Sequence, residues 1–222
     1  MARRTKEDAI ATRNSLIDAA ERVFSEKGVS RASLGDIAQA AGATRGAIYW
    51  HFKDKVDLFS AMMDRVTLPL EQGYSEFECS TCADPVQRLR AVMALVLCSI
   101  ASDERARRVF EVALYKVEYV GEMVGVRDRH VAASEGFTHQ LARDFELAAQ
   151  AQQMVLPMGP AEVAIGLHAL FDGLIRNWIL GGGRFDLVRV GRISTDAFLL
   201  GLGLKLPAEV EAEPLVSCIG TV

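Results

Sequence analysis

Two short amphipathic segments joined by a glycine turn, between Ser33 and Phe52, leave this chain few possible folds. Ser33 followed by Asp36 is the hydroxyl and acid pattern of a helix start, and the apolar stripe of this helix stops before Gly42. Thr44 can begin the next helix, which runs to Phe52. Because only two residues separate the helices, they must meet at a tight turn, for which Gly42 supplies the left-handed backbone. The spacing predicts a helix-turn-helix.

The rest of the chain also shows helical periodicity. A stripe over residues 8–27 ends at Gly28, and Asp54 with Asp57 begins a helix over 55–77, in which Pro69 should cause a kink or end the helix near Leu68. Aromatic residues make up only 7% of the chain, whereas Ala, Leu, Arg and Glu are plentiful, which favours helices over sheets. We therefore predict an all-α fold, a three-helix N-terminal unit followed by a helical bundle, with helices over 86–101, 104–118, 122–155, 160–180 and 187–203.

Composition excludes several classes of protein. Half of the 222 residues are apolar and 24% are charged, which fits neither a disordered nor a collagen-like chain. We find no uncharged apolar run of the roughly 18 to 20 residues that span a bilayer and no secretory leader, so we expect a cytoplasmic protein with no membrane partner. The four cysteines form no even framework of spacings, so we expect no disulfides.

The net charge of −4 conceals an asymmetry. Residues 1–55, which we call the head, hold 10 Lys or Arg against 7 Asp or Glu, a net +3; the remainder holds 15 against 22, a net −7. A basic head on an acidic body is typical of a phosphate-binding module joined to a different kind of domain.

The second short helix carries the candidate DNA-binding residues. Two outward aromatics beside an arginine suit a major groove, which is about 12 Å wide and admits one helix. Ser33 and Lys55, at the starts of flanking helices, would contact phosphates. In the alternative interpretation the aromatics pack the head against the second domain. Ala47, Ile48 and Phe52 should face the core, and the outward set is Thr44, Arg45, Gly46, Tyr49, Trp50 and His51.

Ser33–Ala38 (SLGDIA) and Ala41–Lys55 (AGATRGAIYWHFKDK) resemble the TetR family of bacterial repressors, a likeness that extends over residues 12–58. Residues 2–6, 50–52 and 172–178 are similar to its AcrR-type branch, which controls drug-efflux pumps. The resemblance implies a homodimer whose heads bind a palindromic operator and whose bodies bind a small hydrophobic effector that releases the DNA. The domains expected are 1–55 for DNA binding, 56–206 for ligand binding and dimerisation (56–78 being a connecting helix), and a flexible tail at 207–222.

In that branch the effector cavity lies between the middle helices of the body. His168 and Asp172 share one helix face and could be its polar anchors, although Asp172 could instead be paired with an arginine or with His168 for structure alone. Such a wall suits varied hydrophobic ligands. The expected wall is Val92, Met93, Val96, Phe110, Leu114, Phe137, Leu141, His168, Asp172 and Ile175.

Small residues such as Gly166, Gly173 and Gly201 are frequent in the last two long helices, which could pack as a dimer interface or as an intramolecular core. We favour the dimer, because one recognition helix covers too few base pairs. Cys79 and Cys82 have metal or redox spacing but lack further ligands, and no catalytic arrangement is readable, so we expect no metal, cofactor or enzyme activity. The rival hypothesis is an enzyme or carrier with an incidental basic head.

Overall fold

The computed structural model describes residues 6–80 and 84–207, and all regular structure within them is helical. The all-α prediction is therefore confirmed. The expected tail beyond Pro207 lies outside the described residues, as does Cys82. The helices are α1 (Lys6–Lys27), α2 (Leu34–Ala40), α3 (Arg45–His51), α4 (Lys55–Ser80), α5 (Pro85–Ser102), α6 (Glu104–Tyr115), the 3-10 turn η1 (Gly121–Met123), α7 (Val124–Ala151), α8 (Pro160–Leu180) and α9 (Leu187–Gly201).

The chain divides into two compact units. Among the described residues, the first joins residues 6–69 with Asp103–Val131, and the second joins those of 70–102 with residues 132–207. The head thus shares a unit with the first part of α4, with α6 and with the start of α7. These units follow packing, whereas the boundary at residue 55 concerns function and stays a prediction.

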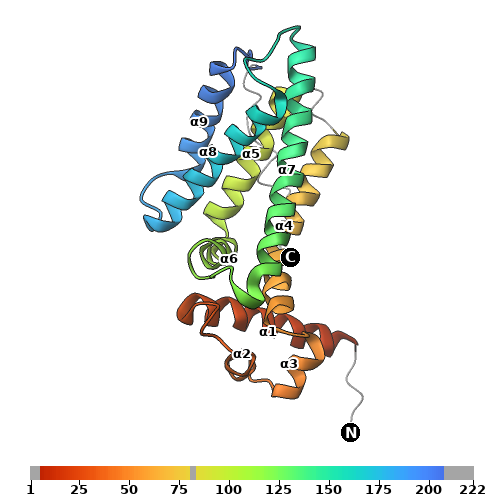
Figure 1. Ribbon diagram of the computed structural model, residues 1–222, viewed down its shortest axis with the longest axis vertical. Helices are drawn as coiled ribbons and strands as arrows, with labels where there is room; N and C mark the ends of the chain where they lie inside the picture. The colour runs from red at the N-terminus through yellow and green to blue at the C-terminus, as the bar shows by residue number, and fades with distance from the viewer. Residues whose placement is uncertain (1–5, 81–83, 208–222) are drawn as a thin grey trace. The chain divides into compact units, whose positions relative to one another are not determined.

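In the first unit, α1 is the element around which the others pack. α2, α3 and α6 all contact it, with α6 on the side opposite to α2 and α3 in Figure 1. The shared core includes Phe24, Phe52 and Phe59, all nearly inaccessible to solvent. Burying an aromatic side chain contributes about 1.5 to 3 kcal/mol, so these contacts fix α3 and α4 on α1.

In the second unit, α5 packs along α9. A Cβ atom on Gly191 of α9 would lie 1.9 Å from Cδ1 of the buried Leu97, so only glycine allows this approach. Arg88 of α5 pairs with Asp144 in the interior, and Arg90 donates from Nε to Asp196 at 2.7 Å. Buried arginines need such partners.

Of the two outcomes predicted for Pro69, the end of the helix near Leu68 is wrong, because α4 continues to Ser80, and the kink stays a prediction. The loss of one amide donor is outweighed by the helical residues on both sides. By length and composition alone α5 and α8 could cross a membrane, although α5 contains Arg88 and Arg90 and α8 contains Asp172, so neither is an uncharged apolar run. Half of that window in α5 and a third in α8 is buried inside the protein, and core helices of soluble proteins pass the same test.

Candidate nucleic-acid interface

The turn between α2 and α3 has the local structure that the sequence predicts. Oγ of Ser33 accepts a hydrogen bond from the amide of Asp36, whose carboxylate accepts one from the amide of Ser33, a reciprocal capping box. The side-chain hydrogen bond from Lys27 at 2.8 Å, together with those from Ser33, lowers the pKa of the Asp36 carboxyl well below its ordinary range. Gly42 has φ +66°, the left-handed conformation expected of it.

One face of α3 packs against the core, and the opposite face is exposed to solvent. Oγ1 of Thr44 accepts a hydrogen bond from the amide of Ala47 at 3.2 Å and so caps the helix, while Ile48 and Phe52 are buried. Tyr49 and Trp50 are 61% and 73% exposed. Exposed aromatics of this size on a short, well-anchored helix are unusual for a surface that meets only water.

Three other predicted contacts surround these aromatics. The exposed Arg45 lies against α2, since a Cβ atom on Gly35 would come 3.3 Å from its Nε. Gly46 is exposed and presents its backbone. His51 is only half-buried and stands edge-on to the Trp50 ring, with centroids 4.5 Å apart. Their roles at DNA stay predictions.

Lys55 is placed differently from a free phosphate contact. Its Nζ lies 3.0 Å from Oε1 of Glu122, in the turn before α7, and 3.5 and 3.4 Å from the carbonyls of Ser30 and Ala32. The lysine side chain is mostly buried, whereas the glutamate is exposed. A phosphate would therefore have to replace Glu122 as the counter-ion of this ammonium group.

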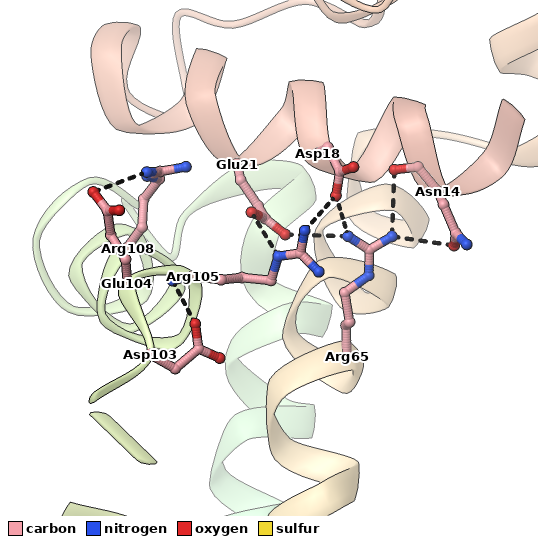
Figure 2. Close-up of polar contacts among 8 residues, drawn as sticks. All are labelled: Asn14, Asp18, Glu21, Arg65, Asp103, Glu104, Arg105 and Arg108. Atoms are coloured by element: carbon pink, nitrogen blue, oxygen red, sulfur yellow. Dashed lines mark hydrogen bonds and ion pairs between the residues drawn. The ribbon is translucent and has the colours of Figure 1, made fainter. Parts of the chain in front are cut away.

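The sequence analysis does not predict a cluster of charged side chains that α1 shares with α4 and α6. Glu21 of α1 is buried, and Arg65 of α4 and Arg105 of α6 reach it at 3.4 and 3.5 Å (Figure 2). Burial raises the pKa of the Glu21 carboxyl, and the positive charges of Arg105 and Arg65 act against this rise. A usable signal existed: Glu21 sits within the apolar stripe of α1, between Ala20 and the buried Val23 and Phe24.

The predicted effector wall is spread over both units. Val92, Met93, Leu141 and Ile175 are buried, and Val96, Phe137 and His168 are half-buried, all in the second unit. Phe110 and Leu114 belong to α6, in the first unit.

The two expected polar anchors differ. Nδ1 of His168 lies 3.4 Å from Oγ of Ser134, and its ring stands edge-on to Phe137. Asp172 is half exposed and lies 3.8 Å from Nε of Arg176, so the burial that made it a candidate anchor is absent. Its pairing with an arginine one turn away matches the structural alternative.

An open groove of about 710 Å³ lies between α7 and the start of α8, and its lining shares no residue with the predicted wall. Its lining is Gly136, His139, Gln140, Ala142, Arg143, Glu146, Pro160 and Ala161. Among the side chains that the structure describes, no three from His, Cys, Asp or Glu gather as a metal site requires.

Family profiles match most of the chain. The profile described as "Bacterial regulatory proteins, tetR family" matches residues 16–62, and that of the "MAATS-type transcriptional repressor, C-terminal region" matches residues 84–203. The chain is 36% identical to the HTH-type transcriptional regulator AcrR of Shigella flexneri over 95% of this chain and 100% of that relative. It is also 36% identical to the HTH-type transcriptional regulator TtgR of Pseudomonas putida, over 85% and 90% of the two chains.

Solved structures agree. NalD, described as the secondary repressor of the MexAB-OprM multidrug efflux pump in Pseudomonas aeruginosa, superposes with a TM-score of 0.79 at 33% identity, over 89% of this chain and 98% of that one. A SmeT–triclosan complex gives 0.77 at 32% identity, over 90% and 97%. SmeT is described as the repressor of the Stenotrophomonas maltophilia multidrug efflux pump SmeDEF.

Proposed function

Because this chain belongs to the TetR family of bacterial regulatory proteins, we propose that it represses a multidrug efflux operon and leaves its operator when a small hydrophobic molecule binds. The similarity to NalD and SmeT, both described as repressors of multidrug efflux pumps, supports the choice of operon. The protein acts in the cytoplasm, where its operator lies.

The outward face of α3 carries this proposal. Ile48 and Phe52 fix the helix from behind, so Tyr49 and Trp50 stand clear at 61% and 73% exposure, with Arg45 one turn earlier. In a major groove Arg45 reads a base edge, and the Tyr49 hydroxyl donates to a phosphate. The remaining contacts proposed are Ser33, Thr44, Gly46, His51 and Lys55.

The partner is a second copy of this chain. Along α8, Ile165 and Leu180 are exposed apolar residues, and along α9, Ile193 and Leu200 are exposed at helical spacing. Gly166, by contrast, meets the Phe198 ring of α9, so part of the small-residue stripe serves packing within the chain. Two heads on a dimer read a palindrome whose half-sites are about 34 to 36 Å apart.

The effector binds among the half-buried apolar and aromatic residues of the body. His168 is the better polar anchor, because its ring is already oriented by Ser134 and Phe137, whereas Asp172 faces solvent beside Arg176. Triclosan is the first probe to use, since it occupies the related SmeT structure. His168→Phe should weaken the response to triclosan and leave operator affinity without triclosan unchanged.

The test is a gel shift with the purified protein and the intergenic DNA upstream of its own gene, at low salt and with excess unrelated DNA. A specific complex that triclosan dissociates is the expected result. If no specific complex forms, the repressor assignment is wrong and the rival, an enzyme or carrier with an incidental basic head, takes its place. Because Arg45 has no structural ion pair among the described residues, Arg45→Ala serves as a folded negative control.

A further inference from the structure

The chain passes between the two compact units three times. It crosses inside α4 after Pro69, between α5 and α6 at Asp103, and inside α7 after Val131. A change in the second unit reaches the first through the covalent chain at these three places. Polar side chains beside these places add to the apolar core that α4 and α6 share with α1.

Arginines beside two of the crossings, one on α4 and one on α6, pair with the same two carboxylates of α1. Arg65, four residues before the first crossing, pairs with Asp18 and lies 3.4 Å from Glu21. Arg105, at the second crossing, lies 3.1 Å from Asp18 and 3.5 Å from Glu21. Figure 2 shows the two guanidinium groups converging on α1 from α4 and α6.

The arginine beside the third crossing pairs with α4 instead of α1. Nη2 of Arg129 in α7 donates to both carboxylate oxygens of Asp64 in α4, at 2.6 and 2.9 Å. Through this pair α7 is linked to α4, whose next residue, Arg65, continues the connection to α1. Arg65 and Arg105 are thus the arginines beside the crossings that form ion pairs with α1.

The two arginines are not held equally. Arg65 is 19% exposed and also donates to the carbonyl and Oδ1 of Asn14, whereas Arg105 is 46% exposed. An exposed guanidinium exchanges its partner for water at little cost. Glu21 keeps Arg65 when Arg105 departs, so the buried carboxylate is never left without a cation. Of the two ties, that of Arg105 is the one that can open reversibly.

The first turn of α6 gives Arg105 its direction. Asp103 caps the helix by accepting a hydrogen bond from the amide of Arg105 at 2.8 Å. The neighbouring Arg107 and Arg108 pair with Glu104 of the same helix, at 3.8 and 3.5 Å. Among the three arginines of this turn, Arg105 forms the direct ion pairs with α1, whereas Arg108 acts on Glu21 only through its charge.

We propose that Arg105 is a positioning residue through which the body controls the head. While it pairs with Asp18 and Glu21, α6 stays on α1 and the head keeps the arrangement that binds operator DNA; effector binding pulls α6 away and opens this pair. The inference rests on the proposed function and adds the residue at which control is exerted. By linkage, operator binding must in turn hold the pair closed.

Arg105→Met in the full chain tests this, with Arg107→Met as the matched control, because Arg107 is 48% exposed in the same turn but pairs within its own helix. Fluorescence anisotropy on operator DNA without effector should show a Kd raised by about 2- to 5-fold for Arg105→Met, the most that an exposed ion pair can contribute, and an unchanged Kd for Arg107→Met. Arg105→Lys should restore part of the affinity. Operator DNA should slow amide hydrogen exchange at residues 104–108 of the wild type but not of Arg105→Met.

Two results would overturn the inference while the wild type binds operator normally. One is an Arg105→Met protein with wild-type operator affinity. The other is a lowered melting temperature with unchanged affinity and unchanged exchange protection by DNA, which marks a purely structural pair. If Arg105→Met does not fold, the Arg105→Lys affinity and the wild-type exchange measurement decide. A wild type that ignores the operator overturns the proposed function itself, a separate outcome.

Discussion

Replacing Tyr49 by phenylalanine removes one hydroxyl from the outward side of α3 and nothing else. The side chain is 61% exposed, and among the described residues its hydroxyl has no hydrogen-bond partner, so folding stability should not change. In the proposed operator complex the hydroxyl donates to a phosphate. A hydrogen bond to a charged group is worth about 1.5 to 3 kcal/mol, so each head should lose about 10- to 150-fold in affinity.

The chain offers a matched control in Tyr119. Its hydroxyl donates to the carbonyl of the buried Ala113 at 2.9 Å. Tyr119→Phe should therefore lower the free energy of unfolding by about 1 kcal/mol and leave operator affinity unchanged, the reverse of Tyr49→Phe. Fluorescence anisotropy at several salt concentrations, with thermal unfolding of each variant, measures both quantities.

Salt dependence separates this contact from an ionic one. A neutral hydroxyl displaces no counter-ion, so Tyr49→Phe should shift the plot of log Kd against log salt without altering its slope. The reasoning is refuted if Tyr49→Phe binds the operator as tightly as the wild type, or if it unfolds early, because then Tyr49 is either idle at the DNA or part of the fold.

Three further outcomes follow from the same geometry. Arg45→Ala should relax recognition, costing about 1 to 3 kcal/mol at one base position across a panel of operator variants, whereas Lys55→Ala should weaken binding evenly and reduce the salt slope. Glu122→Gln removes the counter-ion of Lys55, so operator affinity should rise in the same anisotropy assay; an unchanged affinity would show that this ammonium never meets a phosphate. The depressed pKa of Asp36 means that its contribution to stability is present above its ordinary pKa of 3.8 and is lost as the pH falls below it. Asp36→Asn should accordingly flatten the acid side of the profile of unfolding free energy against pH, measured by urea denaturation.

Features set by neighbours in the sequence could be predicted. The caps at Ser33 and Thr44, the left-handed Gly42 and the buried side of α3 all depend on residues within about one helical turn, and each is present. Helix periodicity and capping act over this range, so the residues themselves contain the information.

Features set by distant residues could not be predicted. The spacing predicts that Lys55 contacts a phosphate, but it does not reveal that Glu122, which follows α6 in the chain, is the counter-ion of this lysine. The spacing also predicts that Asp172 lies in a buried pocket, but α8 is exposed to solvent at this residue. Helical periodicity tells which residues share a face and not what covers that face, so burial along α8 could not be read from spacing.

A charged residue inside an apolar stripe is an exception to this limit. It indicates that a partner from elsewhere in the chain must lie nearby, although it does not identify that partner. Glu21 must be buried if α1 packs as its stripe requires, and a buried carboxylate needs a cation or a proton. The sequence therefore demands that some Lys or Arg approach α1 from another helix. Packing supplies Arg65 and Arg105, which lie 44 and 84 residues away in sequence. These two arginines also lie beside places where the chain crosses between the units. The cations that compensate the buried charge of Glu21 are therefore also well placed to respond to a change in the second unit.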